Sequence, residues 1–382
     1  MNRISICTVC MNRLPHVRKT LPANIQENIG FPNIEFVLLD YNSSDGLEEW
    51  IRSNMMQYIK SGILKYYRTT EPAYFSMSHS KNMVSRLASG NILCMMDGDN
   101  YAGVNYAKWI NSVFVEKGDN SVVSAFTSDG LKYIDMGGKI TFHRHLFSKV
   151  RGFDESFIGY GMDDKDLLVR LEKAGGTPVT IENTAYMRFI EHSTVQRLNN
   201  YHLLNNLESL YMLAADVQPP VTALYTMKDD SFYEVVYKFN EKFRYEFQST
   251  LGGWYVEKNG YKQGSFERLG EGLKIMGDEP VFYRYMDKRL VADAEDKKMV
   301  WRKMESSDDY YWLLIKAFSE CHNRIKYNNN KESNETVNPD GWGRGTVYLN
   351  FDYTTPLYCG EYSQDPDIHA SIHHCEGDPF AE

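Results

Sequence analysis

The sequence predicts an α/β fold with a mostly parallel sheet, followed by a smaller β-rich domain. In the first half of the chain, short apolar runs alternate with segments of helical periodicity, as in a sheet covered by helices on both faces. The run at residues 92–96 is apolar throughout and bounded by polar residues, which is typical of a strand buried on both faces. Beyond residue 217 the sequence becomes aromatic and β-prone.

The elements of the first half follow from these patterns. Pro15 suits the first turn of a helix, and Gly90 is a typical helix end. Strands are predicted at residues 4–10, 34–39, 64–68, 92–96 and 122–126, with a short one near 185–190. Helices are predicted from about residue 14, from about residue 47, and at residues 75–88, 101–116, 146–150 and 167–174.

The second half is predicted to begin at a rigid break. Pro219 and Pro220 follow a helix predicted at residues 199–215, so we place a boundary there. The predicted domains are a catalytic domain at residues 1–217, a β-rich accessory domain at 218–325, and a mobile loop with a C-terminal tail at 326–382, to which no role is assigned. Strands are predicted at 232–239, 281–285, 299–304 and 311–315, with a hairpin at 254–266 that turns at Asn259 and Gly260.

Aromatic and histidine residues of the second half allow two interpretations each. Tryptophans could stack on sugar rings or form the core of a small β domain, and the core is favoured. They are Trp254, Trp301, Trp312 and Trp342. In the tail, a group of four residues has a spacing that permits a metal ion, but solvated histidines are the favoured interpretation. They are His369, His373, His374 and Cys375.

Composition limits the classes of function. The 382 residues, 42% of them hydrophobic, suffice for two or three domains with real cores. The net charge of −9 and the lack of a basic stripe argue against binding to nucleic acid. The six scattered cysteines do not indicate a disulfide framework, and Cys7 and Cys10 read as buried apolar residues. The N-terminus reads as a strand rather than a signal peptide, and the apolar runs are too short to span a bilayer, so we expect a cytoplasmic protein.

Two aspartates follow the strand at residues 92–96. Asp97 and Asp99, separated by Gly98, would lie at the carboxyl end of a parallel strand, where open α/β sheets bind their ligands. Carboxylate oxygens suit Mg²⁺ or Mn²⁺, whose shell is commonly completed by substrate phosphates. The alternative is a plain solvated turn, because aspartate and glycine are turn-forming residues.

A second acidic group lies at the start of the helix predicted at residues 167–174. Asp163, Asp164 and Asp166 fall in its first turn, after a glycine-flanked loop. Favourable interaction with the helix dipole explains one such residue. Three are more than capping requires, which indicates a functional site.

With these motifs in order, the sequence resembles the GT-A glycosyltransferases, specifically the family-two type with a galactosyltransferase-like C-terminal motif. The resemblance covers about residues 1–215. Residues 40–46 resemble the nucleotide-binding loop, Asp97-Gly98-Asp99 the DxD motif, and residues 159–167 the glycine–acidic pair motif. Ser80-Lys81-Asn82 stands where family two has an Ala-Arg-Asn-like helix start. The departures are Met162 and Asp163, where the family has Trp and Glu, and they concern the acceptor-side contacts.

The resemblance implies a Rossmann-like nucleotide-diphospho-sugar transferase domain with an appended β-rich domain, and it implies a role for each matching residue. Asp99 and His192 would hold Mn²⁺ (or Mg²⁺), because an imidazole ligand favours manganese. Asp164 would be the catalytic base. Asp163, Gly161, Tyr160 and Gly138 would bind the acceptor or donor sugar. The nucleotide would be bound by Thr8, Asn12, Arg13, Asp40, Asn42, Ser44, Lys81 and Asp97.

We therefore expect a metal-dependent, inverting hexosyltransferase with a nucleotide sugar as donor and a saccharide as acceptor. The resemblance favours UDP-Gal or UDP-GalNAc as donor and a surface polysaccharide or lipid-linked oligosaccharide of a bacterium as acceptor. Such an acceptor would bring the enzyme to the inner face of the membrane as a peripheral protein. The alternatives are a non-catalytic nucleotide-sugar or glycan-binding protein on the same fold, and a retaining transferase.

Overall fold

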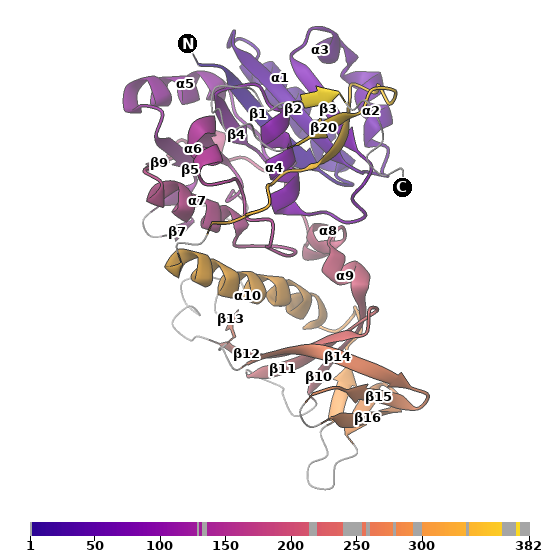
Figure 1. Ribbon diagram of the computed structural model, residues 1–382. Helices are drawn as coiled ribbons and strands as arrows, with labels where there is room; N and C mark the ends of the chain where they lie inside the picture. The colour runs from indigo at the N-terminus through magenta and orange to yellow at the C-terminus, as the bar shows by residue number, and fades with distance from the viewer. Residues whose placement is uncertain are drawn as a thin grey trace. The chain divides into compact units, whose positions relative to one another are not determined.

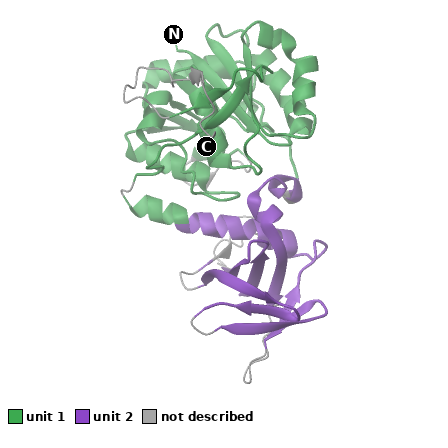
Figure 2. Ribbon diagram, turned by 45° about the vertical axis from the view of Figure 1, so that its right-hand side comes forward, with its two compact units in different colours: residues 1–192, 326–382 green, residues 193–325 purple. Residues whose placement is uncertain are grey.

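A computed structural model of the protein describes residues 2–127, 130–131, 136–213, 220–239, 254–256, 260–277, 280–292, 300–333, 336–360 and 372–374. The chain divides into two compact units, which Figure 2 draws in different colours. Unit 1 comprises residues 1–192 and 326–382, and unit 2 comprises residues 193–325. The boundary along the chain therefore falls after residue 192, whereas it was predicted at residue 217, and residues 326–382 belong to unit 1 again.

Unit 1 is built on a mixed sheet of ten strands in the order β21-β20-β19-β3-β2-β1-β4-β8-β5-β9 (Figure 1). Strand β1 pairs in parallel with β2 and β4, whereas β8 runs antiparallel to β4 and β5. The predicted α/β class is confirmed, but the sheet is mixed rather than mostly parallel. The strands are β1 (Ile4–Cys10), β2 (Ile34–Tyr41), β3 (Leu64–Thr69), β4 (Ile92–Met95), β5 (Ser121–Ser124), β8 (Ile140–His143), β9 (Thr177–Thr180), β19 (Gly345–Leu349), β20 (Leu357–Cys359) and β21 (Ile372–His374).

Helices cover both faces of this sheet, so unit 1 has three layers. Alternation along a strand sends successive side chains to opposite faces, and each face has its own core. Ile6 and Cys94 pack in the core beneath α1, α2 and α5, whereas Val9 and Leu93 pack beneath α4, α6 and α7. The helices are α1 (Leu14–Asn28), α2 (Leu47–Asn54), α3 (Met56–Lys60), α4 (Met77–Leu87), α5 (Tyr106–Lys117), α6 (Arg144–Lys149) and α7 (Asp163–Lys173).

The strands and helices predicted up to residue 174 are present, with ends displaced by a few residues, but the strand predicted near 185–190 is not. That stretch holds a 3₁₀ helix, η1 (Thr184–Tyr186), and one isolated bridge between Asn100 and Phe189. A further short pair, β6 (Phe126–Thr127) and β7 (Gly130–Leu131), lies outside the large sheet.

The segment predicted as a loop and tail is part of unit 1. Strand β19 pairs antiparallel with β3, so the chain end extends the main sheet. Trp342 is buried, with its ring 5.3 Å from that of Phe147 and the Arg86 guanidinium 4.2 Å from its centre. Trp342 is therefore a core residue, but of unit 1 rather than of the predicted small β domain. His369 and Cys375 lie outside the described residues, as do the side chains of His373 and His374.

Unit 2 contains a closed antiparallel sheet. Eight of its nine described strands form a closed ring in the order β10-β11-β12-β14-β15-β16-β17-β18, and β18 pairs with β10. The strands are β10 (Leu207–Leu213), β11 (Val221–Met227), β12 (Ser231–Phe239), β14 (Tyr261–Leu269), β15 (Gly272–Ile275), β16 (Val281–Met286), β17 (Arg289–Ala292) and β18 (Val300–Lys303), with β13 (Trp254–Tyr255) beside β12. Trp301 and Leu290 lie in the core inside it, so the β-rich prediction is confirmed.

Three predictions for the second half were wrong. Residues 199–215 form no single helix, because two short helices, α8 (Thr194–Leu198) and α9 (His202–Asn206), lead into β10, whose pairing with β11 and β18 decides the conformation. Residues 311–315 begin a helix, α10 (Tyr311–Glu332), because an apolar run of this length fits either state. The predicted hairpin does not form between its two strands: β13 and β14 both pair with β12, and residues 257–259 of the turn lie outside the described residues.

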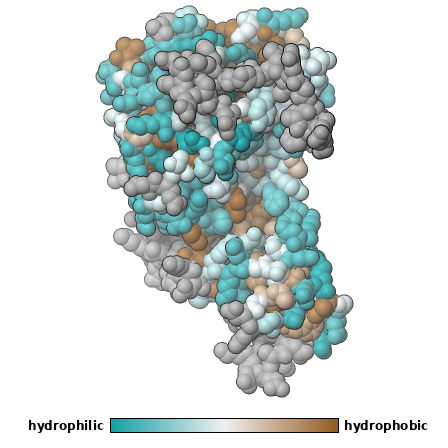
Figure 3. Space-filling view, in the orientation of Figure 1, coloured by the Kyte–Doolittle hydropathy of each residue, from teal (hydrophilic) through white to brown (hydrophobic). Residues whose placement is uncertain are grey.

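Hydrophilic residues cover much of the face of unit 1 seen in Figure 3. Within the part of the chain that the structure describes, no helix combines the length and the apolar character needed to cross a membrane. Five cysteines are described, and all five are buried and free, as predicted for Cys7 and Cys10.

Candidate functional site

The candidate site lies at one edge of the sheet of unit 1. Strands β1 to β4 are parallel, so their carboxyl ends share this edge. Strand β8 runs in the opposite direction beside β4, with Ile140 opposite Met95, so it begins where β4 ends. The predicted loops after β1, β2 and β4 and the start of β8 are thereby brought together.

The loops that follow β1 and β2 are tied to each other. The side-chain oxygen of Asn12 accepts a hydrogen bond from the backbone N–H of Ser44 (2.7 Å), and the Asn12 N–H donates to the Ser43 hydroxyl (3.0 Å). Asn42 donates to the carbonyl of Pro72 in the loop after β3 (2.9 Å). Asn12 and Asn42 both adopt positive φ, which asparagine tolerates better than most residues. These residues therefore shape the predicted nucleotide loop through their contacts with it.

Asp40, predicted to bind the nucleotide, makes hydrogen bonds within the protein. Its side chain is fully buried, and its oxygens accept hydrogen bonds from the Tyr66 hydroxyl (2.6 Å) and the Ser43 N–H (2.8 Å), with Arg68 at 3.9 Å. Burial raises the pKa of Asp40, against the hydrogen bonds of Tyr66 and Ser43. Because Asp40 is fully buried, its carboxyl group supports the loop after β2, and its contact with the base or ribose stays a prediction. Thr8 is buried within β1, and Arg13 is the residue that precedes α1.

Asp99 and His192 meet at the same edge although they lie far apart in the sequence. The His192 Nε2 atom is 2.7 Å from the Asp99 Oδ2 atom, and both side chains are largely buried. The other ring nitrogen of His192 is buried without a hydrogen-bond partner among the described residues. A carboxylate oxygen and an imidazole nitrogen that converge in this way are a donor set that suits Mn²⁺.

These two residues fit the expected metal, with most of its shell left to other ligands. Among the described residues there is no group of three or more His, Cys, Asp or Glu side chains that could hold a metal ion. Divalent ions held by one or two protein ligands complete their shell with water and substrate phosphates. The site therefore fits an ion that binds together with a diphosphate.

A polar stripe on α1 braces the loop that holds the two aspartates. Its members recur every four residues, and all are buried: His16, Thr20, Asn24 and Asn28. Thr20 donates to the carbonyl of Gly98 (2.7 Å), and Asn24 accepts from the N–H of Ala102 (2.7 Å). The His16 ring meets that of His192 edge-on at 5.6 Å. This stripe was not predicted, although its four-residue spacing on a helix is visible in the sequence.

Lys81 forms ion pairs with three carboxylates through its ammonium group. Its ammonium lies 2.7 Å from Asp164, 3.7 Å from Asp97 and 3.9 Å from Asp163, and its side chain is almost completely buried. We call these four residues the Lys81 cluster. One ammonium faces three carboxylates, so the cluster keeps an excess of negative charge.

The environment shifts the pKa values of the cluster. Burial alone would lower the pKa of Lys81, but attraction by Asp164, Asp97 and Asp163 outweighs burial and raises it. Lys81 is therefore a fixed cation. Burial raises the pKa of Asp164, and the charges of Asp163 and Asp97 add to this effect, whereas Lys81 opposes it. A raised pKa brings a carboxylate closer to the range in which general bases work best.

Gly138 lies against Asp97, which explains why a glycine is needed there. A Cβ atom added to Gly138 would lie within 2.8 Å of all three atoms of the Asp97 carboxyl group. The next residue, Lys139, is fully buried and donates to the carbonyls of Tyr101 (3.0 Å) and Ala102 (3.2 Å). It thus fixes the chain that follows Asp99, a role that was not predicted from the sequence.

The acidic motif begins α7 as predicted. Gly159, Gly161 and Met162 all have positive φ, which turns the chain sharply into the helix. Tyr160 and Gly161 are partly exposed in this turn. Asp163 is buried, and its Oδ2 atom has no hydrogen-bond partner among the described residues, whereas Asp164 is more exposed.

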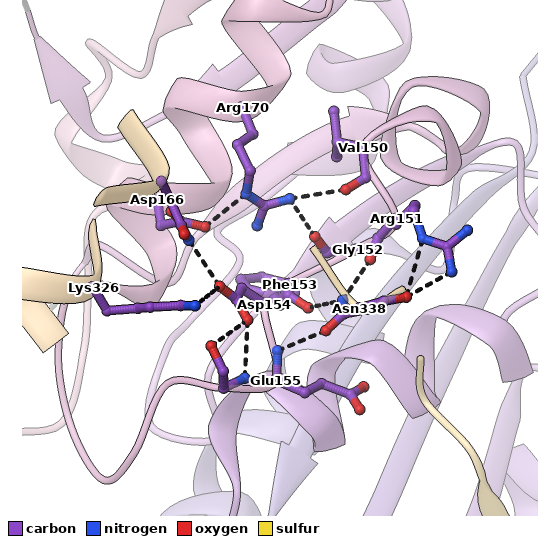
Figure 4. Close-up of polar contacts among 12 residues, drawn as sticks. Val150, Arg151, Gly152, Phe153, Asp154, Glu155, Asp166, Arg170, Lys326 and Asn338 are labelled. Carbon is purple, nitrogen blue, oxygen red and sulfur yellow. Dashed lines mark hydrogen bonds and ion pairs between the residues drawn. The ribbon is translucent and has the colours of Figure 1, made fainter. Parts of the chain in front are cut away.

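Asp166 has a structural role. Its carboxylate accepts hydrogen bonds from Arg170 (2.7 Å) and from Asn330 (2.9 Å), and Asn330 also donates to Asp154 (2.8 Å). Figure 4 shows Asp166 turned toward Arg170. Both oxygens of Asp166 are therefore occupied, which separates it from its two neighbours in the Lys81 cluster.

Asn338 holds the loop that precedes the acidic motif (Figure 4). Its side chain donates to the carbonyls of Arg151 (2.8 Å) and Phe153 (2.7 Å) and accepts from the N–H of Glu155 (3.0 Å). Glu155 in turn accepts from Asn82 (2.7 Å), the residue after the lysine of the cluster. Residues from the end of the chain thus support the site, which no local sequence signal indicated.

Comparison with known proteins agrees with part of this picture. Residues 126–200 match the family described as the N-terminal domain of galactosyltransferase. This segment contains Gly138, the acidic motif and His192. The match agrees with the class of enzyme predicted from the sequence, a glycosyltransferase. No curated protein matches the chain.

Solved structures give weaker likenesses. The mannosyltransferase PcManGT from Pyrobaculum calidifontis, in complex with GDP-Man and Mn²⁺, is 20% identical, with a TM-score of 0.39 over 47% of this chain and 55% of that one. S. aureus TarS 1-349 in complex with UDP is 13% identical, with a TM-score of 0.39 over 48% and 59%. The chain thus spans less than two thirds of either protein, and these likenesses are too weak to assign a substrate.

Proposed function

We propose that this chain is a metal-dependent, inverting glycosyltransferase of the GT-A type that transfers a sugar from a nucleotide diphosphate. The observation that carries the proposal is the meeting of Asp99 with His192 beside the Lys81 cluster, at the carboxyl ends of the parallel strands. The predicted donor is UDP-Gal or UDP-GalNAc. The predicted acceptor is a hydroxyl of a surface polysaccharide or lipid-linked oligosaccharide, reached from the cytoplasmic side of the membrane.

Each residue has a distinct task in this proposal. Asp99 and His192 hold the divalent ion, which supplies Lewis-acid stabilisation of the leaving diphosphate. Asp164 removes the proton of the acceptor hydroxyl, and Lys81 holds one oxygen of Asp164 in place. Asp163 binds a sugar hydroxyl through its Oδ2 atom, which accepts no hydrogen bond from the described residues and lies 3.9 Å from the Lys81 ammonium. Asn12, Asn42 and Ser44 shape the loop for the nucleotide.

Nucleotide binding is expected to require the metal. Asp97, Asp163 and Asp164 leave the Lys81 cluster with excess negative charge, which repels a free diphosphate. Calorimetry of UDP with and without Mn²⁺ measures this directly. Affinity should fall strongly in EDTA and in an Asp99→Asn variant with Mn²⁺ present. Equal UDP affinity in EDTA would contradict the metal assignment.

Gly138→Ala is expected to weaken UDP–Mn²⁺ binding by about tenfold with little loss of stability, because the added methyl group displaces the Asp97 carboxylate. Gly30→Ala is the matched control, since a Cβ atom there meets nothing within 4 Å. Calorimetry and thermal unfolding of both variants check the result. Unchanged UDP affinity in the Gly138 variant would show that Asp97 does not contribute to the nucleotide site.

A further inference from the structure

A polar cleft of about 300 Å³ opens at one end of the closed sheet of unit 2. Its walls come from the ends of β10, β11, β16 and β18 and from the turn into β17. The lining residues are Glu208, Ser209, Tyr211, Thr226, Tyr285, Asp287, Lys288, Arg289 and Lys303. This volume lies at the lower end of the range for small-molecule sites and is enough for a ligand of one or two sugar rings.

Two lining residues belong to the inner face of the closed sheet. Residues paired across antiparallel strands share a face. Lys303 is paired with Tyr211, and Tyr285 is paired with Leu290. Tyr211 and Leu290 are both members of the core inside the sheet. The ammonium-bearing chain of Lys303 and the ring of Tyr285 therefore lie at the mouth above that core.

The cleft holds two cations that make no ion pair within the described part of the chain, although the carboxylate of Asp287 also lines it. Among the described residues, neither Lys303 nor Arg289 has an ion pair or a side-chain hydrogen bond. The carboxylate of Glu208 is already paired with Arg268. Lys288 forms an ion pair with Glu305 at 3.6 Å, but both side chains are highly exposed, so water screens this pair. The chain as a whole has a net charge of −9, so two unpaired cations in one cleft are a local exception to its acidic character. These cations favour the binding of an anionic group.

The remaining groups indicate what carries that anion. Tyr285 is 44% exposed and presents an aromatic face with a hydroxyl, as residues at polar binding sites do. Arg289 has the planar fork that binds carboxylate or phosphate through two parallel hydrogen bonds. The acidic net charge of the chain disfavours a long polyanion such as nucleic acid. We propose that this cleft binds an acidic saccharide, one or two rings that bear a carboxylate or a phosphate.

This site is separate from the proposed transfer site, so binding can be tested without activity. The full chain is titrated by calorimetry with glucuronic acid, glucose 6-phosphate, maltose and inorganic phosphate. Both acidic sugars, or one of them, should bind more tightly than maltose and than phosphate. Which acidic sugar binds distinguishes a carboxylate from a phosphate as the recognised group.

Variants assign the binding to the cleft. Lys303→Met and Arg289→Gln should each weaken binding of the acidic sugar by about tenfold, the effect of one charge-assisted hydrogen bond. Lys262→Met is the matched control, because Lys262 is an exposed lysine of the same sheet that is paired with Glu234 and lies outside the cleft. Circular dichroism checks that each variant is folded. Binding that survives both substitutions, binding of maltose with equal affinity, or binding of phosphate as tight as that of the sugars (an adventitious ion only) would each overturn the proposal.

Discussion

Replacing Asp164 by Asn is expected to lower the rate of sugar transfer by about 10²–10⁴-fold, the usual contribution of a general base. The substitution keeps the shape of the side chain, and the amide oxygen can still accept the hydrogen bond from Lys81. UDP–Mn²⁺ affinity should stay within a few-fold, because Asp164 does not hold the metal. Single-turnover kinetics and calorimetry separate the two effects.

Asp163 provides the comparison within the same motif. Asp163 is more buried than Asp164, and one of its oxygens lacks a hydrogen-bond partner, which suits a residue that binds a sugar hydroxyl. Asp163→Asn should therefore raise a KM together with its loss of rate. A variant of Asp164 with near-normal turnover, alongside an inactive Asp163 variant that still binds nucleotide, would show that the two roles are reversed.

The pH dependence of transfer offers an independent check on Asp164. A general base works in its deprotonated form, and burial together with Asp163 and Asp97 raises the pKa of Asp164. The rate should therefore increase as pH rises through this elevated pKa, above the range of an ordinary aspartate. In the Asp164→Asn variant that increase should be absent from the residual rate.

Lys81→Met is expected to destabilise unit 1 by about 3–5 kcal/mol, the cost of removing one partner from a buried ion pair. The side chain of Lys81 is 3% exposed, so water cannot replace its charge. Its loss would leave Asp97, Asp163 and Asp164 to repel one another. Chemical denaturation measures the change in the free energy of unfolding, and Lys108→Met is the control at an exposed lysine.

A double variant tests the physical cause of that loss. Adding Asp164→Asn to Lys81→Met removes one of the three uncompensated carboxylates, so it should restore part of the lost stability. If Lys81→Met unfolds as easily as the Lys108 control, or if the second substitution restores nothing, the charge balance of the Lys81 cluster is not what stabilises this edge of the sheet.

Much of unit 1 could be predicted because its signals are local. The alternation of apolar runs and helical segments located β1 to β5 and the helices between them. The abrupt change from the apolar β4 to Asp97 and Asp99 placed two carboxylates at the end of a strand, and the glycines before Asp163 located the start of α7. These features depend on residues a few positions apart, so they can be predicted from the sequence alone.

The tertiary structure decided what depends on residues far apart in the sequence. No residue near Asp40 in the sequence indicated that the Tyr66 hydroxyl would donate a hydrogen bond to its carboxyl group. No local signal indicated that Asn338 would hold the loop before Asp163. The pairing of β19 with β3, which extends the sheet, was likewise not predicted. A buried polar group must find a partner wherever the fold brings one, and strand pairing is satisfied in the same way. The sequence determines which side chain stands at each position. The partner of each buried polar group is decided only when distant segments pack together.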